Sequence, residues 1–411
     1  MADSIDKSVT DTKTTVEIPG AEEIIQDQQE KIEKVQSDGG PVEIEMDDQG
    51  GAEISFDPNA VTPEGGEEHF SNLAEFLDDG LLTELATTLS DKYTSYKESR
   101  ADWEDSYREG LDLLGFKYQR RTQPFRGASS VTHPVLAEAV AQFQATAYKE
   151  LLPADGPVRS QILGAVTPAK QDQANRVKDF MNYQLMDQMK EYEPEFDQML
   201  FYLPLAGSTF KKVYYDDLLG RAVSKFVHSD DLVVPYSATS LEDAEAVVHV
   251  IKMSENELRK QQVSGFYKDI DLGEPPVVEN QLTEKKQELE GITQNGQEDM
   301  YTLLEFHIDL DLEGYEDVNP EDGEPTGIKV PYIVTVDTAN TEILSIRRNY
   351  QAEDPLKKKI NYFVQFKFLP GTGFYGFGLI HMIGGLTRTA TSALRQLLDA
   401  GTLANLPAGF K

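Results

Sequence analysis

The sequence predicts an α+β protein: a helical part comes first, a region of antiparallel and mixed sheet follows, and one more helix comes last. Apolar residues between positions 82 and 114 recur every three, four or seven residues, which is the helical period. Apolar and polar residues alternate in several short segments of residues 208–370, which is the strand period. Because the two patterns do not alternate along the chain, a parallel βαβ sheet is not expected.

The acidic N-terminal segment, residues 1–68, is predicted to be a disordered tail. It holds 4 Lys or Arg and 19 Asp or Glu, with few aromatic residues and three glycine pairs. Such a segment cannot bury enough apolar surface to offset the entropy lost on ordering. An acidic interaction arm is the functional alternative.

Residues 69–207 are predicted to be a helical segment with four helices. The first helix carries one apolar stripe and ends at Gly115. The stripe consists of Leu82, Leu85, Leu89, Tyr93, Tyr96, Trp103, Tyr107, Leu111 and Leu114. Proline suits the first turn of a helix, and a proline opens each of the other three. We expect these helices at residues 134–152, 168–192 and 194–206.

Residues 208–370 are predicted to hold the sheet region. The strands are expected at residues 210–215, 221–227, 231–237, 246–253, 301–310, 330–336, 342–348 and 361–368. The first two form a hairpin, and Ser254 with Glu257 forms a capping box that opens a short helix. Residues 270–300 are polar, acidic and interrupted by Gly and Pro, which predicts a flexible insertion.

Residues 371–411 begin with "GTGFYGFG", which matches the dinucleotide-binding pattern GxGxxG at Gly371, Gly373 and Gly376. A dinucleotide site also needs a second strand with an acid at its tip, whereas a single helix follows here. The aromatic rings between the glycines would also crowd a pyrophosphate. We therefore expect a structural hinge at these three glycines and Gly378, with a nucleotide-binding enzyme as the alternative.

The sequence offers no complete motif for catalysis, metal or cofactor binding, so neither an enzyme nor a cofactor is expected. There are no cysteines, and the P-loop, GxSxG and HExxH patterns are absent. "DLDLEG", starting at Asp309, resembles a calcium loop, but Pro320 stands where the loop requires a Glu. His307, Asp309 and Asp311 alternate along a predicted strand and could offer metal ligands, although the solvent face of a half-covered sheet has the same pattern.

The net charge of −34 argues against a protein that grips nucleic acid over a wide basic face. It is compatible with a conduit, because a surface along which a duplex slides should avoid tight phosphate contacts. The longest apolar run, "FGLIHMIGGL", is about half of a bilayer span, and the N-terminus lacks an apolar signal core. No membrane association is therefore expected, and the lack of cysteine fits a reducing cytoplasm.

Three basic clusters interrupt this acidic chain. They are Arg120, Arg121 and Arg126; Lys211 with Lys212; and Lys357 to Lys359. Each could meet phosphate or an acidic neighbouring subunit, and ordinary solvated charge is the alternative. The arginine cluster is a candidate subunit-interface or phosphate-facing site.

Five segments, taken in order, resemble the portal (head-to-tail connector) proteins of tailed bacteriophages, and most closely the long portals of short-tailed phages. They are "DWEDSYREGLDLLG", "RRTQPFRGASSVTHPVLAEAVAQFQATAYKELLP", "LPLAGSTFKKVYYD", "DDLVVPYSAT" and "GFYGFGLIHMIGGLTRTATSALRQLLDAGTLANLPAGF". The resemblance runs from about residue 70 to the end, apart from residues 270–300. None of the segments is catalytic, so the specificity of the resemblance lies in their number and order. A different virion structural or adaptor protein with a related wing-like fold is the alternative, which ring symmetry would distinguish from a portal.

The resemblance implies a ring, typically a dodecamer, at one capsid vertex. Portals of this kind nucleate procapsid assembly with the scaffolding and major capsid proteins and dock the terminase large subunit. They pass double-stranded DNA through a channel and later hold tail adaptor proteins, so the expected location is the virion and, during assembly, the host cytoplasm. Residues 69–370 would form the outward wing, and the glycine-rich turn would lead into a helix toward the stem.

Members of this family continue into a clip, a second stem helix and a crown, so we expect this chain to be truncated at its C-terminus. The terminal helix contains small residues that would let neighbouring backbones approach closely in a ring. These are Gly384, Gly385, Ala390, Ser392 and Ala393. Arg388 and Arg395 are seven residues apart and share a helical face, which we expect to meet an adjacent subunit. Solvent exposure of that face is the alternative, and ring assembly that survives reversal of both charges would refute the expectation.

Overall fold

The structure is a computed structural model that describes residues 43–46, 52–55, 69–116, 121–216, 219–275, 281–291, 300–318, 324–371 and 373–405. The chain divides into two compact units, Met1–Ser71 and Asn72–Lys411, which are described separately. In the first unit, β1 (Glu43–Met46) and β2 (Ala52–Ser55) pair antiparallel. The remainder of the acidic tail, up to residue 68, lies outside the described residues, so its disorder stays a prediction.

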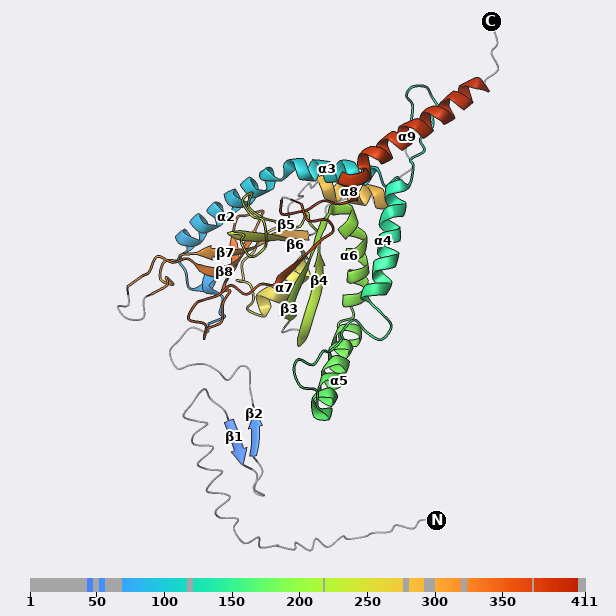
Figure 1. Ribbon diagram of the computed structural model, residues 1–411. Helices are drawn as coiled ribbons and strands as arrows, with labels where there is room; N and C mark the ends of the chain where they lie inside the picture. The colour runs from blue at the N-terminus through green and yellow to red at the C-terminus, as the bar shows by residue number, and fades with distance from the viewer. Residues whose placement is uncertain are drawn as a thin grey trace, which may run out of the picture. The chain divides into compact units, whose positions relative to one another are not determined.

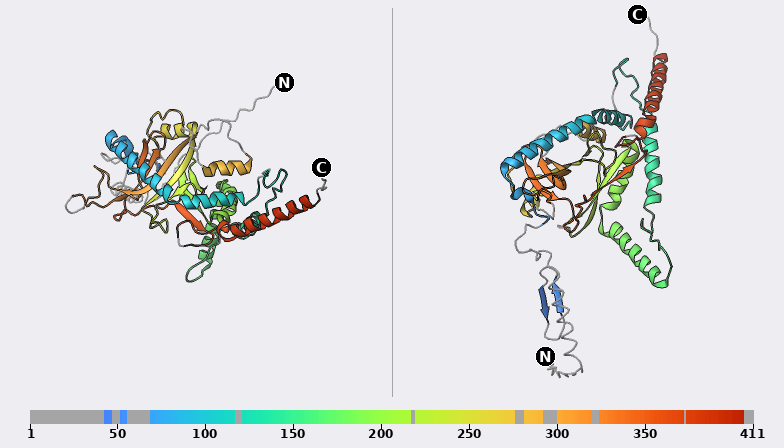
Figure 2. Two further views of the ribbon diagram at one scale, coloured as in Figure 1. Left: turned by 90° about the horizontal axis from the view of Figure 1, so that it is seen from above. Right: turned by 60° about the vertical axis from the view of Figure 1, so that its left-hand side comes forward.

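The second unit confirms the α+β class (Figure 1). Its described strands form a three-stranded and a five-stranded sheet, and they pair only antiparallel. Helices lie along the outside of the sheets instead of alternating with the strands (Figures 1 and 2). Within the described part of the chain, every helix is too short or too polar to cross a bilayer.

The long first helix is confirmed in its apolar stripe but wrong in its continuity. A short 3-10 turn, η1 (Leu73–Glu75), is followed by α2 (Asp79–Ser99) and α3 (Ala101–Asp112). The two helices are separated at Arg100, whose φ of −109° and ψ of 10° are not helical. Stripe residues on both sides of the break are buried, and α3 is followed by Gly115 with a φ of +71°. Neither Gly nor Pro causes the break; the contacts of Arg100, described below, hold it.

The next three helices begin close to where the prolines place them. They are α4 (Val135–Leu151), α5 (Pro168–Tyr183) and α6 (Tyr192–Ala206). The Thr167 hydroxyl accepts a hydrogen bond from the Lys170 amide at the start of α5. This helix is shorter than predicted, because a π-helical segment, η2 (Gln184–Gln188), replaces its last turns. Gly207 ends α6 with a φ of +97°.

The three-stranded sheet has the order β10 (Phe363–Lys367), β3 (Ser208–Asp216), β4 (Arg221–Val227), which confirms the hairpin of the last two. The five-stranded sheet has the strand order β5 to β9. Its strands are β5 (Leu232–Val233), β6 (Ala246–Ser254), β7 (Met300–Leu310), β8 (Val330–Asp337) and β9 (Ile343–Arg348). β5 is much shorter than the predicted strand at residues 231–237. The capping box of Ser254 and Glu257 is confirmed at the start of α7 (Glu255–Val263).

Two apolar clusters hold the sheets in place. The inner face of α2 packs on one face of the five-stranded sheet, where Leu82 and Leu89 meet residues such as Phe306. A second cluster contains Phe210 of the three-stranded sheet and Leu232 of the five-stranded sheet, so it joins the two sheets. Phe374, from the glycine-rich turn, belongs to the same cluster.

The flexible insertion predicted at residues 270–300 is wrong for residues 281–290, which form α8 (Gln281–Glu290). Leu282 is buried in the cluster that contains Tyr107, and Lys286 forms an ion pair with Asp230. These two long-range contacts give a polar segment the burial that its composition did not suggest. The last helix is α9 (Leu379–Ala404).

Candidate functional site

The glycine-rich turn between β10 and α9 is held tightly by neighbouring backbone. Gly376 has a φ of +66°, and a Cβ added to it would lie 2.9 Å from the Leu369 carbonyl oxygen. A Cβ on Gly378 would lie 2.3 Å from the Leu205 carbonyl oxygen. These two glycines are therefore required where the turn crosses the end of α6.

The other two predicted hinge glycines differ from each other. A Cβ on Gly371 would lie 2.8 Å from the Phe377 ring, whereas one on Gly373 would meet no atom within 4 Å. The space next to the GxGxxG backbone at Gly376 is thus filled by the chain itself, which favours a structural turn over a phosphate cradle. That these glycines form a structural hinge between domains stays a prediction.

Two aromatic residues of the turn, Phe374 and Tyr375, pack into the unit and anchor the turn. Phe374 stacks on Phe210 with a centroid distance of 5.7 Å. Tyr375 stacks on Trp103 of α3 at 4.6 Å, and Trp103 also stacks on Tyr107 at 5.5 Å. The turn before α9 is in this way fixed to the helix that follows the Arg100 break.

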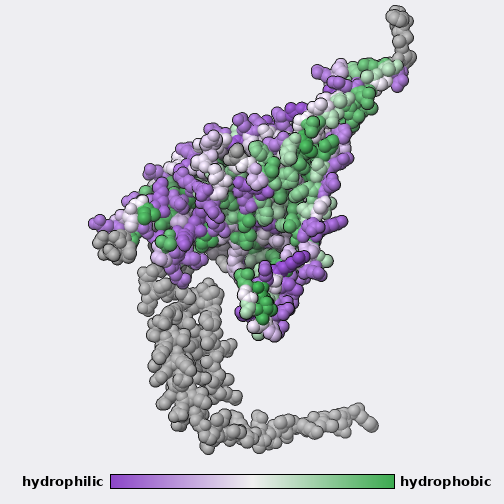
Figure 3. Space-filling model, in the orientation of Figure 1, coloured by the Kyte–Doolittle hydropathy of each residue, from purple (hydrophilic) through white to green (hydrophobic). Residues whose placement is uncertain are grey.

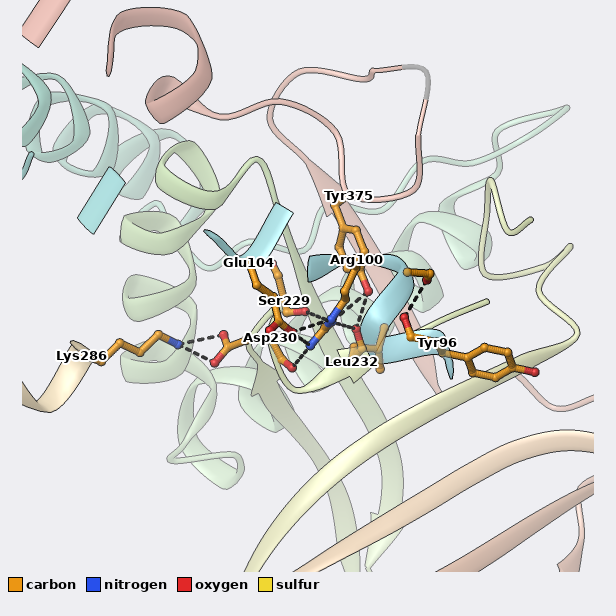
Figure 4. A network of polar contacts seen from close by, with 9 residues as sticks. Tyr96, Arg100, Glu104, Ser229, Asp230, Leu232, Lys286 and Tyr375 are labelled. Atoms are coloured by element: carbon orange, nitrogen blue, oxygen red, sulfur yellow. Dashed lines mark hydrogen bonds and ion pairs between the residues drawn. The ribbon is translucent and has the colours of Figure 1, made fainter. Parts of the chain in front are cut away.

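Arg100 forms the centre of this arrangement (Figure 4). Its Nη1 donates to the carbonyl oxygens of Ser229 at 3.0 Å and Leu232 at 2.8 Å, and to the Tyr375 hydroxyl at 2.9 Å. Its Nη2 donates to the Asp230 carbonyl oxygen at 2.5 Å, and its Nε donates to Glu104 Oε1 at 2.8 Å. The guanidinium thereby donates to three backbone carbonyls, and the Tyr375 hydroxyl donates to one of them as well, the Leu232 carbonyl oxygen, at 2.9 Å.

We call the set Arg100, Glu104, residues 229–232, Lys286 and Tyr375 the Arg100 junction. Lys286 Nζ of α8 contacts both carboxylate oxygens of Asp230, at 2.8 and 2.9 Å. Burial alone would lower the pKa of Arg100, but Tyr375 and Glu104 more than offset it, so the guanidinium stays charged. The junction joins four segments that are far apart in the sequence: the break between α2 and α3, the connection from β4 to β5, α8, and the turn into α9.

Two titratable groups in and beside the junction have strongly shifted pKa values. Burial lowers the pKa of nearby His228 to about 4, so the ring is neutral near neutral pH. Burial and the Asp230 carboxylate raise the pKa of Asp231 to about 7. The hydrogen bonds and ion pair of the junction connect its segments to one another, so it can position α9 relative to the sheets.

The arginines predicted on α9 contact their own chain. Arg388 Nη2 lies 2.9 Å from Glu109 Oε2 of α3, with both side chains about two-thirds exposed. Arg395 Nε donates to the Val131 carbonyl oxygen at 2.6 Å. Arg121 Nη1 donates to the Ser129 carbonyl oxygen at 3.3 Å, so the structure brings Arg121 and Arg395 to the same loop. Arg126 is exposed, and Arg120 lies outside the described residues.

α9 has a second apolar face opposite the one that packs on its own chain. The buried residues of its inner side are Ile380, Gly384, Thr387, Thr391 and Asp399. Its outer face is an uncharged stripe at helical spacing, which we call the α9 stripe: Met382, Leu386, Thr389, Ala393, Leu397 and Ala400. Leu386 is 68% exposed and Leu397 is 71% exposed. Apolar surface is visible along α9 in Figure 3.

The phosphate role considered for Lys211 and Lys212 is wrong, because Lys211 is buried and the half-buried Lys212 is paired within its own chain. Lys211 Nζ lies 4.2 Å from the Tyr192 ring centroid, and burial lowers its pKa to about 8. Lys212 Nζ lies 2.6 and 2.7 Å from the two oxygens of Glu305 on β7. Lys357 pairs with Asp317 instead of standing free.

His307 is buried as well, and its Nε2 lies 2.7 Å from Glu305 Oε1. Its Nε2 therefore already has a carboxylate partner and is not open to a metal ion. Asp311, the last of the three possible ligands, is exposed. Among the described residues, no group of three or more His, Asp or Glu is placed to hold a metal ion.

This buried cluster of Lys212, His249, Glu305 and His307 predicts acid sensitivity. Burial lowers the pKa of both histidines, so below about pH 6.5 the unfolded chain binds more protons than the native one. The free energy of unfolding should therefore decrease as the pH is lowered, by up to about 1.4 kcal/mol per pH unit for each histidine that stays neutral in the folded state. Urea unfolding between about pH 7.5 and about pH 5 measures the slope.

The matched comparison uses His307→Gln, which should give a shallower slope than the wild type. Gln171→Ala, an exposed substitution of a non-titrating residue outside the cluster, should leave the slope unchanged. Equal slopes for all three proteins would contradict the assignment of the acid sensitivity to this cluster.

No protein-family model matches this chain, and no curated protein matches it. Its function is therefore argued from the five segments and from the geometry above.

The sequence did carry one signal for the Arg100 junction. Arg100 occupies a position of the apolar stripe, four residues after Tyr96 and three before Trp103. A charged residue on a buried face requires a partner inside the protein. The identity of the partners, which lie about 130 and 275 residues away along the chain, could not be read from the sequence.

Proposed function

We propose that this protein is a subunit of the portal ring of a tailed bacteriophage. In this role it forms the ring at one capsid vertex, passes double-stranded DNA during packaging and ejection, and catalyses no reaction. The order and number of the five segments support the proposal. The terminase large subunit, the scaffolding and major capsid proteins, and the tail adaptors are the partners that come with it.

The α9 stripe is the observation that carries the proposal. A helix with one apolar face can be stable on its own chain, whereas two opposite apolar faces require a second neighbour. α9 also extends away from the sheets in every view (Figures 1 and 2). The α9 helices of neighbouring subunits would bury these stripes around a common axis, and the small Thr389, Ala393 and Ala400 allow close approach.

The charge of the chain agrees with this role. A net charge of −34 disfavours tight non-specific binding to phosphates, which would hold the DNA in a channel instead of letting it pass. The polar contacts of Arg388 and Arg395 within their own chain also leave the α9 stripe free of charge.

Negative-stain electron microscopy of the purified chain tests the proposal. We expect end-on views of rings with about a dozen subunits, since a heterologous contact that closes gives cyclic symmetry. Leu386→Glu with Leu397→Glu should abolish the rings, because each places a charge in the stripe. Ser392→Glu with Thr402→Glu adds the same charge outside the stripe and should preserve them.

Rings that survive the two substitutions in the stripe would contradict the role of α9. A protein that forms no rings but measurably binds a dinucleotide in calorimetry would instead favour the enzyme alternative at Gly371, Gly373 and Gly376.

A further inference from the structure

A second surface without a partner lies on α5, at a different end of the unit from α9 (Figure 1). None of the residues of α5 is buried. Three large apolar side chains project from it: Val177 is 49% exposed, Phe180 58% and Met181 43%. Figure 3 shows the corresponding apolar patch at the tip formed by α5.

Two cations share this face. With 3.6 residues per turn, Lys170 lies on the face of Val177, seven residues on, and Arg176 lies on the face of Phe180, four residues on. We call Lys170, Arg176, Val177, Phe180 and Met181 the α5 patch. Arg176 has no ion pair among the described residues, and Lys170 contacts only a carbonyl oxygen of the preceding loop, at 3.5 Å.

The charge of this projection is opposite to that of the chain. Residues 156–190 hold five Lys or Arg and three Asp or Glu, a net of +2, within a chain of net charge −34. The complementary occupant is therefore acidic, and a short helix with no fully buried residue gains stability from such an occupant.

A matching acidic surface is present on this chain. Glu84, Asp91 and Glu98 are exposed, follow one another at intervals of seven residues, and so form one face of α2, about 10 Å apart. None of the three has an ion pair among the described residues. The short side chains of Thr88 and Ser95 lie between them, which leaves room for an apolar ridge to approach.

The spacing of the charges on the two helices agrees. Lys170 and Arg176 are six residues apart, or about 9 Å along the axis of α5, close to the interval between successive acids on α2. α2 and α5 lie well apart within the same unit in every view, so α5 does not contact the α2 of its own chain (Figures 1 and 2).

We infer that the α5 patch of one copy packs against the acidic face of α2 in a neighbouring copy. This inference rests on the proposed ring. Because the two surfaces differ, the contact is head-to-tail, which is the kind that builds a closed ring. It gives the ring a second contact, separate from the α9 stripe.

Charge reversal with rescue tests the inference on the full chain. Lys170→Glu with Arg176→Glu should weaken assembly at least about tenfold, as should Asp91→Lys with Glu98→Lys, since each places like charges opposite each other. All four substitutions in one chain should restore assembly. Lys178→Glu with Lys190→Glu, which makes the same charge change away from the patch, should leave it intact, and far-UV circular dichroism should be unchanged throughout.

A disulfide experiment gives a readout that does not depend on ring closure. The chain has no cysteine, so Val177→Cys with Ser95→Cys introduces the only two thiols. A head-to-tail contact should produce a ladder of covalent oligomers under oxidation, whereas either single variant should stop at dimers.

The outcomes separate the two proposals. If rings persist in the Lys170→Glu, Arg176→Glu variant and the double-cysteine variant gives no ladder, the α5 contact is overturned and the portal proposal stands. A ladder without rings would support the contact and count against the portal ring. Neither rings nor a ladder from this chain would overturn both.

Discussion

Gly378→Ala is expected to destabilise the protein by about 3 kcal/mol, near the upper end of the usual cost of overpacking. The new Cβ would lie 2.3 Å from the Leu205 carbonyl oxygen, 2.7 Å from the Gly207 amide nitrogen and 2.8 Å from the Pro204 carbonyl oxygen. All three are backbone atoms, so no side chain can rotate away. The end of α6 and the start of α9 would have to separate.

Gly373→Ala is the matched control in the same loop, because its Cβ would meet no atom within 4 Å. We expect this variant to stay within about 0.5 kcal/mol of the wild type. Urea unfolding of the two variants measures the difference. Equal stabilities would mean that the turn relaxes freely, and the structural interpretation of the glycines would then be wrong.

The elements that the sequence predicted well are those with a local cause. The α6 end at Gly207 and the α7 start at Ser254 follow from a residue that can adopt a positive φ and from a capping box. Strands β7 and β8 followed from their alternation and their bounding turns. In each case, the residues that decide the structure lie within a few positions of one another.

The features that the sequence did not reveal depend on residues far apart in the chain. Lys212 and Glu305, 93 residues apart, form an ion pair that neither segment indicates by itself. α8 is polar and short, and it is ordered through Lys286 and Leu282, whose partners lie elsewhere. The face of α9 that meets its own chain could not be distinguished from the outer one, because both are apolar at helical spacing.

Arg100→Met is expected to have the other large effect, about 3 to 5 kcal/mol of destabilisation, typical of breaking a buried charged network. The methionine would fill much of the volume, but the carbonyl oxygens of Ser229 and Asp230 would lose the guanidinium donor, and Leu232 would keep only the Tyr375 hydroxyl. Glu104 would keep a charge that is largely buried, with no cation beside it. The stability of Arg100→Lys should lie between those of the wild type and Arg100→Met, because an ammonium keeps the charge but cannot reach all these acceptors at once.

The only tryptophan in the chain, Trp103, reports directly on this site, since its ring stacks on Tyr375 and lies 5.6 Å from the Arg100 guanidinium carbon. Arg100→Met should shift its fluorescence to longer wavelength before global unfolding, as the turn into α9 loosens and water reaches the ring. Arg108→Met, which removes an exposed ion pair with Asp105, is the control and should cost less than about 1 kcal/mol. If the two variants unfold at the same urea concentration with unshifted emission, the Arg100 junction does not hold α9 in place, and the clusters of apolar residues alone must do so.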